Sequence, residues 1–123
     1  MSESKFKYQG VGREYQKKLL TAWNDRLQSA ESEGRKVAYL FVPGNVAEFL
    51  RVFDFELVFP EVNALQCGVR KISGDYILKA EDVGYSPDVC GYVKNDIGMM
   101  LAGNVGPSGH KIPKPDLLLC TYC

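Results

Sequence analysis

The chain has 123 residues, 46% hydrophobic and 24% charged, which is typical of one globular domain. Fifteen basic residues balance fifteen acidic ones, so no strong field would attract nucleic acid or an anionic membrane surface. No apolar run approaches the roughly 20 residues of a membrane span, and the polar start lacks the apolar core of a signal peptide. We therefore expect a cytoplasmic protein whose four cysteines are reduced.

The predicted elements alternate between helices and strands. Residues 1–12 are expected to be a flexible lead-in, followed by one α/β domain over residues 13–123. Apolar residues four apart predict a helix from Arg13 that Gly34 ends, and the apolar run 37–42 predicts a buried strand. Further along, the pattern predicts helices over 46–53, 61–72 and 74–83, short strands over 55–59 and 116–120, and a glycine- and proline-rich loop over 103–115.

Residues 87–101 are predicted to form another helix. Ser86 suits the cap, Pro87 the first helical position and Asp88 the positive end of the helix dipole. Cys90 would then lie in the first turn, where the same dipole favours a thiolate.

This order predicts a Rossmann- or flavodoxin-like fold, with a mainly parallel sheet flanked by helices. Ligands of such sheets bind outside the carboxyl ends of the strands, which would bring residues 43–45, 60–63 and 120–123 to one edge. The chain ends at Cys123, directly after an apolar strand. We therefore expect it to be the incomplete N-terminal domain of a larger polypeptide.

Four blocks of the sequence resemble the 2-hydroxyacyl-CoA dehydratase / benzoyl-CoA reductase family. They are residues 41–45 (FVPGN), 59–66 (FPEVNALQ), 80–94 (AEDVGYSPDVCGYVK) and 115–119 (PDLLL). The resemblance covers about residues 15–123 in the right order. The block 80–94 is the most specific, and the combination favours the benzoyl-CoA reductase branch.

The resemblance implies one subunit of a heterodimer that holds a 4Fe-4S iron–sulfur cluster through three cysteines. Cys90 matches the first of these, and Cys123 fits the second better than Cys120 does. The third cysteine would lie outside this chain. An ATP-hydrolysing activator would deliver single electrons to the cluster, and an acyl-CoA thioester would be the substrate. The family also implies an anaerobic cytoplasm.

Polar residues after the strands are candidates for the substrate site. Glu61 and Asn63 would position or exchange a proton at the thioester carbonyl or ring, although a helix-starting acid and a turn asparagine explain them equally well. Gly44 and Asn45 would let backbone amides approach the substrate, although a plain turn is the commoner explanation.

Three other interpretations of the cysteines stay open. They could pack as small buried hydrophobic residues in a non-catalytic α/β binding or assembly domain. The C-x-x-C spacing of Cys120 and Cys123 could form the redox pair of a dithiol oxidoreductase, and the same pair could bind zinc with Cys90 and His110. Cys67 is expected to pack in the core, and His110 to be solvated.

Overall fold

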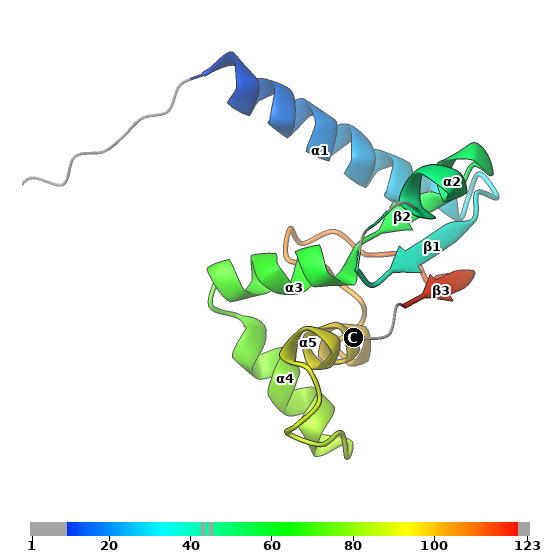
Figure 1. The fold of residues 1–123 in the computed structure, drawn as a ribbon. Coiled ribbons are helices and arrows are strands. Elements are labelled where there is room, and N and C mark those ends of the chain that lie inside the picture. The colour runs from blue at the N-terminus through cyan, green and yellow to red at the C-terminus, as the bar shows by residue number, and fades with distance from the viewer. Residues whose placement is uncertain (1–9, 43, 45, 121–123) are drawn as a thin grey trace, which may run out of the picture.

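The computed structural model describes residues 10–42, 44 and 46–120. In this part the chain forms five helices and three strands (Figure 1): α1 (Val11–Ala30), β1 (Val37–Leu40), α2 (Val46–Val52), β2 (Glu56–Val58), α3 (Pro60–Val69), α4 (Ser73–Asp82), α5 (Gly91–Leu101) and β3 (Leu117–Leu119). None of these helices combines the length and apolar character needed to cross a bilayer.

The three strands form one parallel sheet in the order β2-β1-β3. Ala38 on the central strand lies beside Leu57 on one neighbour and Leu117 on the other. All four residues of β1 are buried, as expected for a central parallel strand covered on both faces. The predicted α/β class with a mainly parallel sheet is therefore confirmed.

Each face of the sheet has its own apolar core because side chains alternate along a strand. Val37, Tyr39 and Val58 face α1, α3 and α5, and they pack with Leu27, Cys67, Met99 and other core residues. Ala38, Leu40 and Leu57 face the opposite way and pack against Leu50 of α2. Figure 1 shows α1 extending beyond the sheet, whereas α3, α4 and α5 lie together on one side.

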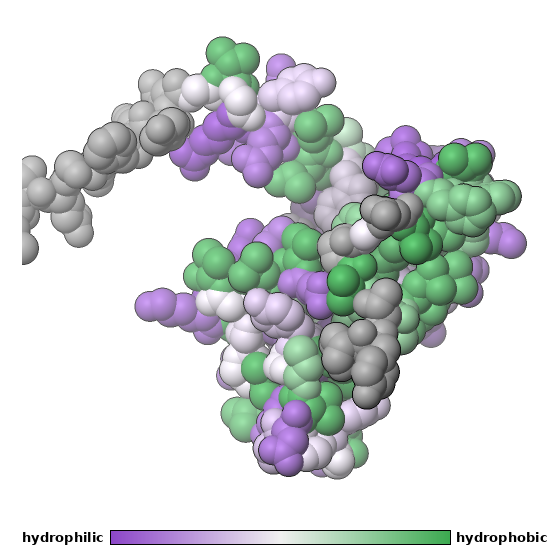
Figure 2. All heavy atoms as spheres, viewed as in Figure 1, coloured by the Kyte–Doolittle hydropathy of each residue, from purple (hydrophilic) through white to green (hydrophobic). Residues whose placement is uncertain are grey.

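The outer side of α2 is strongly apolar. Phe49 is 61% exposed and Val52 is 78% exposed, and the two rings of Phe49 and Phe53 meet edge to face. Figure 2 shows apolar surface gathered over α2 and the neighbouring strands.

Several predicted boundaries differ from the observed ones. The first helix begins at Val11, so residues 11 and 12 are helical rather than part of a flexible lead-in, and residues 1–9 lie outside the described part. The strands are also shorter than predicted: β1 is assigned only to Leu40, and the extended backbone ends by Val42, which lies in the left-handed region at φ 62°.

The prediction that a helix begins at Pro87 is wrong. The backbone amide of Asp88 donates to the Ser86 hydroxyl (3.2 Å), and that of Val89 donates to the Ser86 carbonyl (3.1 Å), so Ser86 closes a separate turn. Cys90 has φ −45° and ψ 128°, and this non-helical ψ interrupts any helix running through it. α5 therefore begins at Gly91, and Cys90 is its N-cap residue.

A buried carboxylate connects α1, α2 and the amino end of the sheet. Glu56, the first residue of β2, is fully buried and accepts hydrogen bonds from three guanidinium groups: Arg26 (2.9 and 2.6 Å), Arg35 (2.8 Å) and Arg51 (3.1 Å). Burial alone would raise the pKa of Glu56, but the hydrogen bonds and charges of the arginines outweigh it and hold that pKa below its usual range.

Replacing Glu56 with Gln should destabilise the chain by about 3 kcal/mol, because three guanidinium groups lose their shared buried partner. The free energy of unfolding at pH 7 in urea measures this. Since the folded-state pKa is lowered, the contribution of Glu56 is present above its unfolded pKa and is lost as pH falls through the folded one. The difference between wild type and variant should therefore shrink in acid; a difference that stays constant would contradict the assignment. Arg26→Gln is the milder control, since Arg35 and Arg51 would remain.

The helices α4 and α5 cross at a glycine. A Cβ atom at Gly98 would lie 1.9 Å from the carbonyl oxygen of Tyr76 and 2.5 Å from its carbonyl carbon, so only a hydrogen atom fits there. This close approach lets Tyr76 reach the core beneath the sheet.

Gly98→Ala should force α4 and α5 apart and destabilise the chain by about 1–3 kcal/mol, as overpacking against backbone does. Gly74→Ala is the matched control, because a Cβ there meets nothing within 4 Å and alanine is favoured over glycine in a helix by about 1 kcal/mol. Thermal unfolding of both variants tests this, and equal stabilisation by the two alanines would rule out the crossing.

Candidate functional site at the carboxyl edge of the sheet

The carboxyl ends of all three strands meet at one edge of the sheet. Beyond β1, the backbone amide of Phe41 still donates to the carbonyl of Leu119 (2.9 Å), so β1 and β3 stay together to their ends. Gly44 and Cys120 follow these strands and are exposed, and Glu61 follows β2. Pro43, Asn45 and residues 121–123, including Cys123, lie outside the described residues.

Glu61 fixes the turn that follows β1. Its Oε2 accepts a hydrogen bond from the backbone amide of Val42 (3.2 Å). Val42 is β-branched and has φ 62°, a conformation that costs energy for such a side chain and that is commonly found at functional sites. The carboxylate therefore holds a strained backbone segment at the edge where ligands of parallel sheets bind.

Asn63 faces away from Glu61, because residues two apart on a helix lie on different sides. Its side chain is only 5% exposed and lines a cavity between α1 and α3, and its Nδ2 has no hydrogen-bond partner in the described part of the chain. Glu61 and Asn63, which the sequence paired, are thus not brought together.

Cys90 is exposed and lies at the N-terminus of α5. The segment before it is held by Lys94, whose buried ammonium donates to Glu81 Oε1 (2.6 Å) and to the carbonyl of Pro87 (2.7 Å). Sequence reasoning missed this lysine, since a charged residue within a helix gives no sign of being buried. These two hydrogen bonds therefore hold the backbone that precedes the exposed Cys90 in place.

The other described cysteines have different surroundings. Cys67 is fully buried with its sulfur 3.9 Å from that of Met99, and burial raises the pKa of its thiol, so its predicted packing role is confirmed. Cys120 and Cys90 are exposed, so burial as packing residues is wrong for both. Within the described residues, no three His, Cys, Asp or Glu side chains gather as a metal site. His110 is exposed beside Ser108, as predicted for a solvated histidine.

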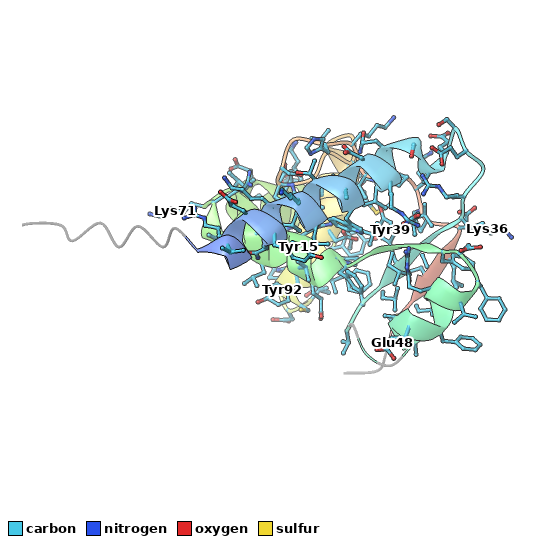
Figure 3. The ribbon with its side chains drawn as sticks, turned by 90° about the horizontal axis from the view of Figure 1, so that it is seen from above. Tyr15, Lys36, Tyr39, Glu48, Lys71 and Tyr92 are labelled. Atoms are coloured by element: carbon cyan, nitrogen blue, oxygen red, sulfur yellow. The ribbon has the colours of Figure 1, made fainter. Side chains whose placement is uncertain are left out.

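Buried polar groups of α5 form a second feature that the sequence did not reveal. Asp96 is 4% exposed, and burial raises its pKa to about 6. Its charge acts on Tyr39, whose own pKa is raised by burial. The Tyr39 hydroxyl donates to the carbonyl of Pro113 (2.8 Å) and accepts from Asn104 Nδ2 (3.2 Å). Figure 3 shows Tyr39 within the molecule, whereas Lys36, Glu48 and Lys71 lie at its periphery.

This geometry defines the class of protein. A short parallel sheet covered by helices makes this an α/β domain, with a strained turn at its carboxyl edge and exposed thiols at a helix N-terminus and a strand end. In domains of this class ligands bind at the carboxyl edge of the sheet.

Comparison with known proteins gives the particular family. The chain is 49% identical over 107 residues to a benzoyl-CoA reductase subunit from Thauera aromatica, and the match covers 87% of this chain and 25% of that protein. Over 93 residues it is 36% identical to the (R)-2-hydroxyisocaproyl-CoA dehydratase alpha subunit of Clostridioides difficile, and 32% to the (R)-phenyllactyl-CoA dehydratase alpha subunit of Clostridium sporogenes. Each of these two matches covers 74% of this chain and 22% of the relative. No family model matches the chain.

The chain belongs to the 2-hydroxyacyl-CoA dehydratase / benzoyl-CoA reductase family, and the resemblance of its sequence blocks is confirmed. All three relatives are named as subunits of enzymes. This chain spans about a quarter of the length of the curated relatives it matches.

Asp96→Asn should remove a pH dependence of stability. Because the folded-state pKa of Asp96 is raised from 3.8 to about 6, the stability associated with its protonated form is present below pH 4 and is lost as pH rises through 6. The stability of the variant relative to wild type should therefore increase between pH 4 and pH 7.5, by up to about 3 kcal/mol. Urea unfolding at both pH values measures this. The exposed Asp82→Asn is the matched control, and an equal response of the two variants would contradict the prediction.

Proposed function

We propose that this chain is part of the iron–sulfur subunit of an ATP-activated benzoyl-CoA reductase or 2-hydroxyacyl-CoA dehydratase. One observation carries the proposal: Cys90 is exposed at the start of α5, in a chain 49% identical over 107 residues to a benzoyl-CoA reductase subunit. Exposure and a helix N-terminus favour a cysteine that acts as a ligand over one that packs.

The proposed cluster ligands are Cys90 and Cys123, with Cys120 the less favoured partner, and a third cysteine outside this chain. Iron–sulfur clusters are held by thiolates, so exposed cysteines suit the task and the buried Cys67 does not. When bound, the 4Fe-4S cluster supplies single electrons at low potential.

The chain's own residues would then arrange the substrate. Glu61, which holds the turn at Val42, would position or exchange a proton at the thioester carbonyl or ring. Asn63 lines the cavity between α1 and α3 instead, so it has no part in this step. Gly44 and Asn45 would present backbone amides to the substrate; a Cβ at Gly44 would meet only the carbonyl oxygen of Val42, at 3.9 Å, so the approach there is open. Hydrogen-bond donors near a carbonyl oxygen stabilise the negative charge that develops on it.

The proposed substrate is an acyl-CoA thioester. One electron added to its carbonyl gives a ketyl-type radical anion. This anion either expels the hydroxyl group of the neighbouring C2 carbon as hydroxide, which takes up a proton to become water, or leads to reduction of an aromatic ring. The proposal includes a related second subunit, an ATP-hydrolysing activator that donates the electron, and an anaerobic cytoplasm.

The test is iron binding by the full-length subunit that contains this chain. After anaerobic reconstitution with iron and sulfide, Cys90→Ala and Cys123→Ala should each abolish the cluster absorption and lower the iron content severalfold. Cys67→Ala, the matched control, should retain both.

Cys120→Ala should also retain the cluster. If it alone of the pair abolished the spectrum, Cys120 rather than Cys123 would be the second ligand. A cluster spectrum that survives both Cys90→Ala and Cys123→Ala would overturn the ligand assignment.

A further inference from the structure

A cavity of about 410 Å³ lies between α1, α3 and the loop that follows α5. Figure 1 shows this loop, in orange, passing between α1 and α3. Trp23 of α1 closes the cavity toward the sheet, since its indole donates to the carbonyl of Leu57 (3.0 Å). A volume of this size is within the range of small-molecule sites.

The loop wall of this cavity is a built structure. The backbone amide of Ile112 donates to the backbone carbonyl of Asn104 (2.8 Å). The backbone amide of Gly106 donates to the backbone carbonyl of His110 (2.8 Å), which closes a tight hairpin. Side chains from two helices hold the hairpin: Gln28 of α1 donates to the carbonyl of Lys111, and Arg70, just beyond α3, donates to the carbonyl of Pro107. The cavity is therefore held open between fixed elements.

The lining of the cavity carries positive charge. Lys17, Arg70 and Lys111 line it together with His110, and none of the described lining residues is Asp or Glu. This bias contrasts with the whole chain, in which acidic and basic residues are equal in number. Three cations gathered without a carboxylate favour an anionic ligand.

A buried donor supports the same conclusion independently. Asn63 is only 5% exposed, lines the cavity and has an Nδ2 with no partner among the described residues. Leaving a buried donor unpaired costs about 1–3 kcal/mol, so a ligand that accepts its hydrogen bond would recover this energy. Hydroxyl and amide groups of Thr21, Asn24 and Ser108 line the cavity as well.

We propose that this cavity binds the phosphate groups of a nucleotide, namely the 3′-phospho-ADP end of the acyl-CoA thioester. The identity of the ligand, including its phosphate ester, rests on the proposed function, whereas its negative charge and its hydrogen-bond acceptors are argued from the lining alone. Val58 and Asn63 place one end of the cavity beside the carboxyl end of β2. From this end of the cavity, the rest of a long ligand would extend toward the turn at Val42 that Glu61 fixes.

The test is binding to the full-length subunit. Coenzyme A, dephospho-coenzyme A, ADP and inorganic phosphate are titrated by calorimetry at low and moderate salt. Coenzyme A should bind most tightly, and more weakly as salt rises, because its contacts are ionic. Lys17→Gln and Lys111→Gln should each weaken coenzyme A binding about fivefold to tenfold, as expected when one charged hydrogen bond is lost. Lys18 and Lys114 do not line this cavity, so Lys18→Gln and Lys114→Gln are the matched controls. Each should change the affinity for coenzyme A less than about twofold.

If Lys17→Gln and Lys111→Gln bound coenzyme A as tightly as their controls, the proposal that this cavity is the binding site would be overturned. Binding of ADP or inorganic phosphate as tight as that of coenzyme A, with the same response to the variants, would overturn the ligand. Iron content is measured on the same preparations: if coenzyme A fails to bind while the cluster forms normally, the present inference fails and the proposed function stands. Loss of the cluster has no bearing on phosphate binding, so the two failures are distinguishable.

Discussion

The ion cluster around Glu56 is the constraint on which the arrangement of the layers depends. A fully buried carboxylate is tolerated only when it is paired and hydrogen-bonded, and here its partners come from α1, from the segment before β1 and from α2. The cluster lies where β2 begins. It therefore fixes α1 and α2 against the amino end of the sheet, and the candidate site at the carboxyl end takes no part in it.

The polar side chains that hold the fold together are distinguishable from those that have no partner in the described part of the chain. Glu61 has its hydrogen bond to Val42, and Lys94 has two that hold the backbone before Cys90. Asn63 has an unused donor among the described residues, and Cys90 is exposed. The satisfied groups supply rigidity, and the unsatisfied ones indicate where a ligand would be recognised.

Much of the fold could be predicted from the sequence because its signals are local. The buried run at β1, the four-residue apolar spacing of α1 and the alternation of elements each reflect backbone geometry over a few residues. The helix predicted from Pro87 was wrong because its capping residues also suit a turn, and only the non-helical backbone of Cys90 distinguishes the two.

The sequence by itself determined the class of the fold, the family and the candidate cysteines, since these depend on short motifs and on the order of elements. Only the tertiary structure decided which charges meet. Lys17, Arg70 and Lys111 lie far apart in the sequence, and they line one cavity because helix packing brings α1, α3 and the loop together. Burial of Glu56 and Asp96 is likewise a property of the packed layers, because nothing in the local sequence specifies what will cover a carboxylate.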